Sequence, residues 1–172
     1  RIESRFVPEP DCRCAEVALR LAELSDVHGQ LVSLTATLTP AMLAWQPRPG
    51  ANTPGMLLAH IAVAQVHLGF VCLAGEAHSD VGSVLALTTE DLGMPLPPEG
   101  TPPAALTGRD AAFYTRLLER AMAHTRHVAR TIEDADLTVA IVRPPRPDGT
   151  VRVFDRRSEE HTSELQSRQY LV

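Results

Sequence analysis

The chain has 172 residues, of which 44% are hydrophobic, 22% charged and only 4% aromatic. This length suits a single domain, and the apolar content excludes an intrinsically disordered chain. The net charge of −5, with basic residues that form no cluster, argues against a nucleic-acid-binding protein. The three cysteines are too few for a disulfide framework, so a reducing, cytoplasmic location is expected.

A first helix is predicted from about residue 12 to residue 38. Side chains suited to a core recur there at alternating spacings of four and three residues, as in a bundle helix. This stripe consists of Val17, Leu21, Leu24, His28, Leu31, Thr35 and Leu38. Cys12 and Cys14 lie at its start, and because no second cysteine pair completes four metal ligands, we interpret them as part of a solvated terminus.

A second helix is predicted to begin at residues 53–54, where threonine is the N-cap and proline takes the first helical position. Residues 45–52 before it contain too much proline for a helix and are predicted to be a loop. Residues 56–75 carry no formal charge, which is also compatible with a membrane span. Polar side chains inside this stretch and the absence of flanking arginines favour a buried bundle helix instead.

The sequence that follows, up to about residue 154, predicts a long connection, a third helix and a β-hairpin. Residues 76–108 are rich in Gly, Pro, Ser and Thr and are expected to contain at most one helical turn. The third helix, about 109–132, has an inward stripe of Phe113, Leu117, Ala121, His124, Val128 and Ile132. Two short apolar runs around an Asp-Gly pair then predict a hairpin near 138–154.

Residues 157–172 are interpreted as foreign to the rest. Arg157 to Ser167 match, without a mismatch, one reading frame of a common sequencing-library adapter, and the adapter frame also ends in Leu-Val. We therefore divide the chain into residues 1–156, an incomplete helical bundle, and residues 157–172, a non-native tail that is excluded from fold reasoning. Three helices do not close a bundle core, so a fourth helix is expected where this tail begins.

Three histidines lie on the predicted inward stripes of three different helices: His28, His60 and His124. Imidazoles that converge inside a helical bundle can hold a metal ion. A core histidine whose ring nitrogens bond to backbone carbonyls or water is the alternative. The spacing alone leaves both interpretations open.

Two stretches of the chain resemble the DinB/YfiT-like family of bacterial proteins. The first runs Leu38-Thr-Pro-Ala-Met-Leu-Ala-Trp-Gln-Pro and continues from Pro49-Gly-Ala-Asn-Thr-Pro to His60. The second contains Asp134-Ala-Asp136-Leu and the later Pro-Asp-Gly-Thr-Val-Arg-Val-Phe. The resemblance covers roughly residues 20–156.

The resemblance implies an all-α fold, a DinB-like up-down four-helix bundle, truncated here before or within its last helix. It also implies a divalent metal, Zn²⁺ or similar, held by three ligands, of which His60 matches the one on the second helix. The remaining ligands are expected beyond residue 156, and His28 and His124 are secondary candidates for substitutes. The chain departs from the family at Gln65, where relatives often carry Glu.

By the same resemblance, the intact parent is a metal-dependent S-transferase or isomerase. It would use a low-molecular-weight thiol of the mycothiol or bacillithiol type and an electrophile, because an open metal position lowers the pKa of a bound thiol. The truncated chain, left with His60, is expected to be inactive. The alternative is a non-catalytic helical bundle that binds a small molecule or a partner, with His60 as a core residue. No nucleic acid or membrane partner is expected, and a homodimer is compatible with the resemblance.

Overall fold

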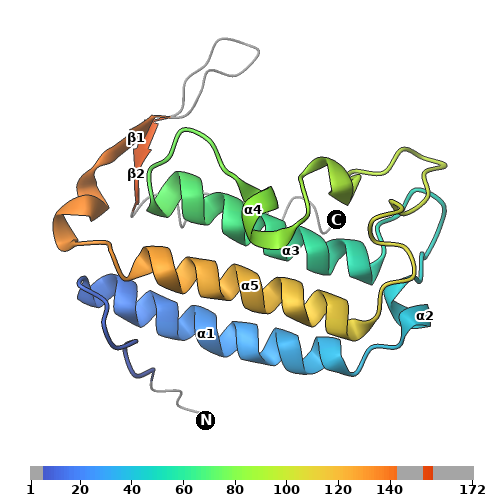
Figure 1. The fold of residues 1–172 in the computed structure, drawn as a ribbon, viewed down its shortest axis with the longest axis horizontal. Helices are drawn as coiled ribbons and strands as arrows, with labels where there is room; N and C mark the ends of the chain where they lie inside the picture. The colour runs from blue at the N-terminus through green and yellow to red at the C-terminus, as the bar shows by residue number, and fades with distance from the viewer. Residues whose placement is uncertain (1–5, 143–152, 157–172) are drawn as a thin grey trace.

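The computed structural model describes residues 6–142 and 153–156. Three long helices dominate this part of the chain: α1 (Ala15–Ala36), α3 (Pro54–Leu68) and α5 (Ala111–Ala129). They lie side by side in Figure 1, and α5 packs against both of the others. The predicted all-α fold is therefore confirmed, with α5 as its central helix.

The long connection between α3 and α5 determines the direction of the helices. It spans the length of the bundle, so that α5 runs the same way as α3, whereas α1 runs the opposite way (Figure 1). The expected up-down order, in which successive long helices alternate in direction, therefore does not hold between α3 and α5. The connection contains the short helix α4 (Val81–Leu85) and the 3-10 turn η2 (Glu90–Leu92), one short element more than expected. Because α4 packs on both α3 and α5, the connection covers one side of this helix pair.

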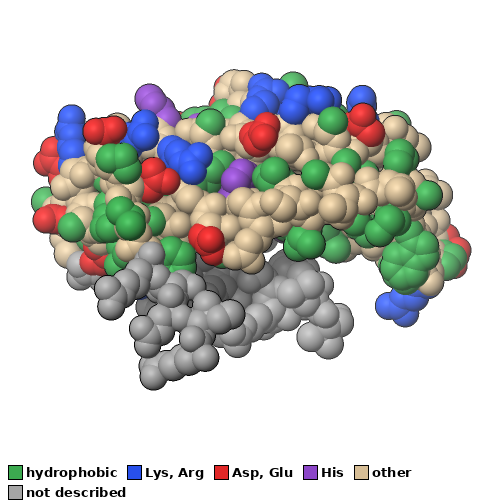
Figure 2. Space-filling view, turned by 90° about the horizontal axis from the view of Figure 1, so that it is seen from below, with side chains coloured by type: hydrophobic (Ala, Val, Ile, Leu, Met, Phe, Trp, Pro, Cys, Tyr) green, Lys and Arg blue, Asp and Glu red, His purple; other side chains and the backbone are tan. Residues whose placement is uncertain are grey.

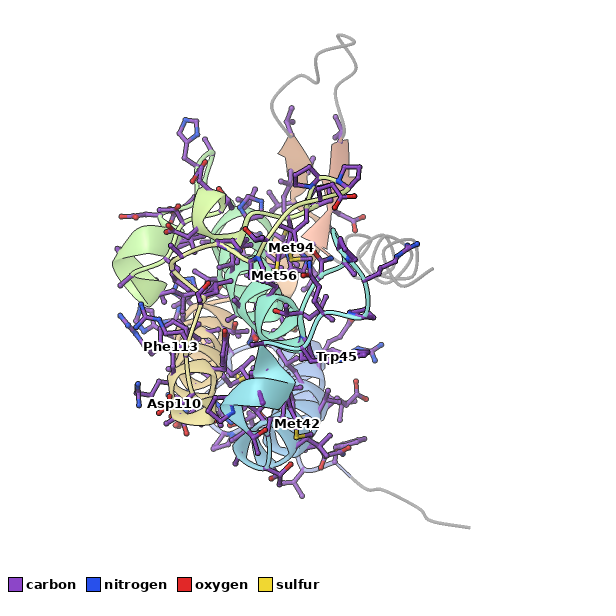
Figure 3. The ribbon with its side chains drawn as sticks, turned by 90° about the vertical axis from the view of Figure 1, so that its right-hand side faces the viewer. Met42, Trp45, Met56, Met94, Asp110 and Phe113 are labelled. Carbon is purple, nitrogen blue, oxygen red and sulfur yellow. The ribbon has the colours of Figure 1, made fainter. Side chains whose placement is uncertain are left out.

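Side-chain caps begin the helices where the sequence predicts them. Thr53 accepts a hydrogen bond from the Met56 N–H at 3.2 Å at the start of α3, and Pro54 occupies the first turn. Thr39 caps the short helix α2 (Pro40–Leu43) in the same way. At the start of α5, the Asp110 carboxylate accepts from the Phe113 N–H at 2.8 Å; both residues are labelled in Figure 3.

The main core lies between α3 and α5. Met56 of α3 and Leu118 of α5 are fully buried, and Met94 of the connection packs against the same cluster (Figure 3). Tyr114 is 2% exposed, and its hydroxyl donates a hydrogen bond to the Leu106 carbonyl at 3.1 Å. The buried hydroxyl is therefore satisfied, as a polar atom inside a core must be.

The end of the described chain returns to the end of α3. A π-helix, η1 (Gly69–Leu73), extends α3, and a 3-10 helix, η3 (Asp134–Thr138), follows α5. The strands β1 (Ala140–Val142) and β2 (Val153–Asp155) then pair antiparallel, which confirms the predicted hairpin. The expected fourth helix and the interpretation of residues 157–172 lie outside the described residues.

Candidate metal-ligand site on α3

His60 lies near the middle of α3, and its side chain is exposed. The side chains with the lowest exposure, Met56, Ala59, Ala62 and Val66, form one buried face of the helix. His60 lies at the border of this face, since Met56, four residues earlier, is its neighbour on the helix surface. His60 and its neighbours Leu57 and Ile61 are exposed instead, the last two at 38% and 41%. Neither ring nitrogen of His60 hydrogen-bonds to a described residue. The prediction that His60 lies on an inward stripe is therefore wrong.

The reason for this error is the composition of α3. The helix is apolar nearly all round, so its hydrophobic pattern does not indicate which side faces the partner helix. The contacts with α5 decide the orientation, and they leave the His60 side chain exposed. Among the described residues His60 is therefore not a core residue; whether it is one in the intact parent, the alternative interpretation, stays a prediction.

The described residues do not complete a metal site around His60. Within residues 6–142 and 153–156, no group of three His, Cys, Asp or Glu side chains lies close enough to hold a metal ion. Zinc sites need three or four such donors at fixed geometry. The described donors therefore do not by themselves fit the metal that the family resemblance implies.

His28 does not join His60. It is half-buried on α1, where burial and then the neighbouring Arg126 guanidinium lower its pKa, while Glu119 opposes that shift. A nearby guanidinium repels a metal cation as it repels a proton. Arg126 is itself held at the α1–α5 interface, where it donates to Ser25 Oγ at 3.0 Å.

His124 is enclosed on the other side of α5. Its ring packs at a tilt against Phe70 of η1, with the ring centroids 4.5 Å apart, and its buried Nε2 atom has no hydrogen-bond partner among the described residues. Burial, and then His127, lowers the pKa of the ring, against an opposing effect of Glu76. The structure thus does not bring His28, His60 and His124 together as one set of metal donors, so of the two interpretations left open by the sequence, the convergence of the three rings is not the one observed.

The two N-terminal cysteines are also placed differently from the prediction. Cys14 is fully buried against Ile132 and Leu137, and Cys12 is partly buried against Leu21. Burial is the largest cause of the raised pKa of both thiols. Cys14 is therefore an inert core residue rather than part of a solvated terminus. Its spacing from Leu21, which continues the α1 stripe backwards, was the signal for this burial.

Gln65 serves the α3–α5 interface. Its side-chain amide donates a hydrogen bond to Thr125 Oγ1 at 3.0 Å and approaches the sulfur of Met122. Gln65 lies on a different side of α3 from His60, since five residues turn a helix by about 140° relative to the starting side chain. This position therefore supplies a neutral interhelical contact and no charge beside His60.

The apolar side chains of α1 show a second uncovered face. Leu24, Val27 and Leu34 are 38%, 60% and 66% exposed. Figure 2, which looks onto the molecule from the α1 side, shows hydrophobic side chains scattered between charged ones over this face. Both helices that flank α5 therefore leave part of their apolar surface uncovered by the described residues.

Comparison with known proteins identifies the family. A family model of the DinB superfamily matches residues 23–156, which is most of the chain. The chain belongs to the DinB superfamily. No curated protein and no solved structure matches it.

One stretch of the described chain passes a test for membrane spans. Pro54–Leu73 is long and apolar enough to cross a bilayer, with a mean hydropathy of 1.9, and half of the tested window is buried. A core helix of a bundle passes the same test, and this stretch supplies the buried face of the α3–α5 core. The test is therefore weak evidence for a membrane-spanning protein.

Proposed function

We propose that the intact parent of this chain is a DinB-superfamily metal-binding protein in which His60 supplies one ligand to a divalent metal. The exposed position of His60 in the middle of α3 carries this proposal. Its ring nitrogens make no hydrogen bond to a described residue and are accessible, as a metal ligand before binding must be. A metal at this point would lie on the face of the bundle that the described residues leave uncovered.

The other ligands would come from the natural continuation of the gene. We propose that this continuation begins after Arg156 and that residues 157–172 are translated adapter. The family match ends at residue 156, which is where the adapter-like stretch begins, and this coincidence supports the proposal. The chain as it stands would then lack a complete metal site and be inactive.

The proposed reaction class is transfer or isomerisation with a low-molecular-weight thiol and an electrophilic small molecule. It rests on the family resemblance and on the metal that the family implies. Because the described residues offer no set of three metal donors, no reaction step is assigned to them. The proposal concerns the intact parent, with a cytoplasmic location and without a nucleic acid or membrane partner.

A second candidate function is a non-catalytic bundle that binds a small molecule or a partner. The absence of three clustered metal donors from the described residues favours it. This candidate predicts a protein that folds fully in the presence of a chelator and contains no stoichiometric metal.

Metal analysis of the protein encoded by the natural gene separates the two candidates. We expect about one zinc per chain in the unchanged protein and a loss of nearly all of it in His60→Ala, with the same thermal unfolding in chelator. His127→Ala is the matched control, since His127 is an exposed histidine on α5. Full zinc in His60→Ala, or none in the unchanged protein, would overturn the metal-binding proposal.

A further inference from the structure

One side of α5 carries a row of arginines. Arg116, Arg120 and Arg130 are exposed, and the helical repeat places them within about 80° of one another around the helix axis. His127 is an exposed member of the same row, and Glu119 is the one acidic residue of the helix. The three arginines form no cluster along the sequence, and it is the helix that brings them to one side.

No described residue neutralises this row. None of the three guanidinium groups forms a salt bridge or a hydrogen bond with a residue in 6–142 or 153–156. Arg126, on another side of α5, is different, because its Nε lies 3.4 Å from the Glu9 carboxylate and its Nη2 donates to Ser25. The row is therefore a positive surface without a counter-charge in contact with it in the described chain.

The connection between α3 and α5 has the opposite charge. Residues 76–99 contain five acidic residues and no arginine or lysine. Four of these acidic side chains are exposed: Glu76, Asp80, Glu90 and Glu99. None of the four forms a salt bridge with a described residue. Because α4 of this connection packs on α5, and both lie to the left in Figure 3, one side of the molecule carries a positive and a negative surface next to each other.

We propose that this side binds a second copy of the chain, with the arginine row of each copy against the acidic connection of the other. A twofold axis between the two surfaces pairs each of them with its complement, so the contact closes as a dimer. Charge complementarity favours this occupant over a nucleic acid or an anionic membrane, because the acidic connection beside the arginines repels a polyanion. Neither surface includes His60, so this inference is independent of the proposed metal site.

Sedimentation velocity of the full chain at several salt concentrations tests the dimer. We expect a dissociation constant of about 50 µM at about 50 mM salt, since each exposed ion pair contributes little. This constant should rise at least about tenfold at about 500 mM salt, because salt screens exposed charges. Association through the exposed apolar side chains of α1 and α3 would not weaken in the same way. A monomer at about 200 µM in low salt, or a dimer that salt does not weaken, would overturn the proposal.

Charge reversal tests the pairing of the two surfaces. Arg116→Glu/Arg120→Glu and Glu90→Arg/Glu99→Arg are each expected to weaken self-association at least about tenfold, because like charges then face each other across the twofold axis. An equimolar mixture of the two variants should recover the dimer, since opposite charges meet again. A mixture that stays monomeric would contradict the pairing, even if each variant alone associates less.

A matched control separates the contact from the effect of net charge. Arg13→Glu/Arg48→Glu makes the same change at exposed positions outside the two surfaces, and its dissociation constant should stay within about twofold of that of the unchanged protein. Thermal unfolding of every variant checks that the bundle is folded. Binding of the monomeric chain to phosphatidylserine vesicles would overturn the proposal in favour of a membrane partner.

Discussion

The two sides of α3 carry similar side chains but have different surroundings. On the side that faces α5, Met56 and Val66 are completely buried, whereas Leu57 and Ile61 on the other side are about two-fifths exposed. His60 lies among the exposed group. Within one helix of nearly uniform apolarity, contact with α5 and α4 therefore separates a packing surface from an available one.

This contrast separates the part of α3 that stabilises the fold from the part that is available for binding. The side of α3 that faces α5 is buried as in a normal protein core: the start of α3 is capped, and the buried Tyr114 hydroxyl has a hydrogen-bond partner. The open side combines apolar side chains with the exposed His60, and no described helix covers it. A surface of this composition is normally covered by another element, a ligand or a partner.

Truncation of a core side chain should give the largest difference between the two sides. Leu118→Ala removes a side chain with 0% exposure at the centre of α5 and should lower the free energy of unfolding by about 2–5 kcal/mol. Ile61→Ala, on the open side of α3, should cost less than about 1 kcal/mol. Denaturant unfolding measures both. Similar losses in the two variants would mean that the open side is packed as tightly as the core.

Two glycine-to-alanine substitutions test the same contrast, because they are expected to change the free energy of unfolding in opposite directions. A Cβ at Gly55 would lie 2.8 Å from Tyr114 Cζ, so Gly55→Ala should destabilise the protein by about 1–3 kcal/mol. A Cβ at Gly29, on the exposed side of α1, has no neighbour within 4 Å. Gly29→Ala should therefore stabilise the protein by about 0.5–1 kcal/mol, because alanine is the better helix former. Thermal unfolding of both variants is the measurement, and shifts in the same direction would contradict this packing.

Lowering the pH should lower the stability of the folded protein, because His28 and His124 are partly buried. The pKa values of His28 and His124 are lowered from 6.5, mainly by burial. As the pH falls below about 6.5, the unfolded chain takes up protons that the folded protein does not, so stability falls. It is fully retained above that pH. The groups facing the rings are Arg126 and Glu119 at His28, and His127 and Glu76 at His124.

The variant His124→Leu isolates one of these contributions. It removes a ring whose buried Nε2 has no partner within residues 6–142 and 153–156, so stability at pH 5.5 should rise toward its value at pH 7. Urea unfolding at the two pH values measures the difference, to which His28 still contributes in the variant. An unchanged difference between the two pH values would show that His124 is not the group responsible.

The smallest effect on stability is expected at His60. Because its side chain is exposed and has no described hydrogen bond, His60→Ala should change the free energy of unfolding by less than about 0.5 kcal/mol in the absence of metal. Denaturant unfolding in chelator measures this. A loss above 1 kcal/mol would place His60 in the packed part of the bundle and remove the argument for an available ligand.

Local patterns in the sequence predicted most of the fold. Thr53 and Pro54 indicated where α3 begins, the stripe through Leu117 and Ala121 predicted α5, and the Asp-Gly pair predicted the hairpin. These features depend on residues that are close along the chain, whose chemistry is set locally. The burial of Cys14 was missed although its spacing from Leu21 fits the stripe, because the residues that cover it, Ile132 and Leu137, follow α5 and are far away along the chain.

The candidate sites depended on contacts that local patterns do not contain. A helical stripe shows that His28, His60 and His124 could share a side with apolar residues, but not toward which neighbour each helix turns. Arg156 gave no sequence signal for its hydrogen bonds, because their acceptors lie in η1 and η3, far away along the chain. Contacts between distant parts of the chain determine both the orientation of the histidines and the position of Arg156. Composition and spacing along the sequence do not contain these contacts.

The chromosomal DNA sequence beyond the codon for Arg156 tests the central claim most directly. The account predicts an open reading frame that continues into an amphipathic helix with two further metal ligands, His or carboxylate, spaced to share one side. These would complete a site with His60 on the open side of α3. Chromosomal DNA that instead encodes residues 157–172 as they stand, or a last helix without ligand-type residues, would contradict it.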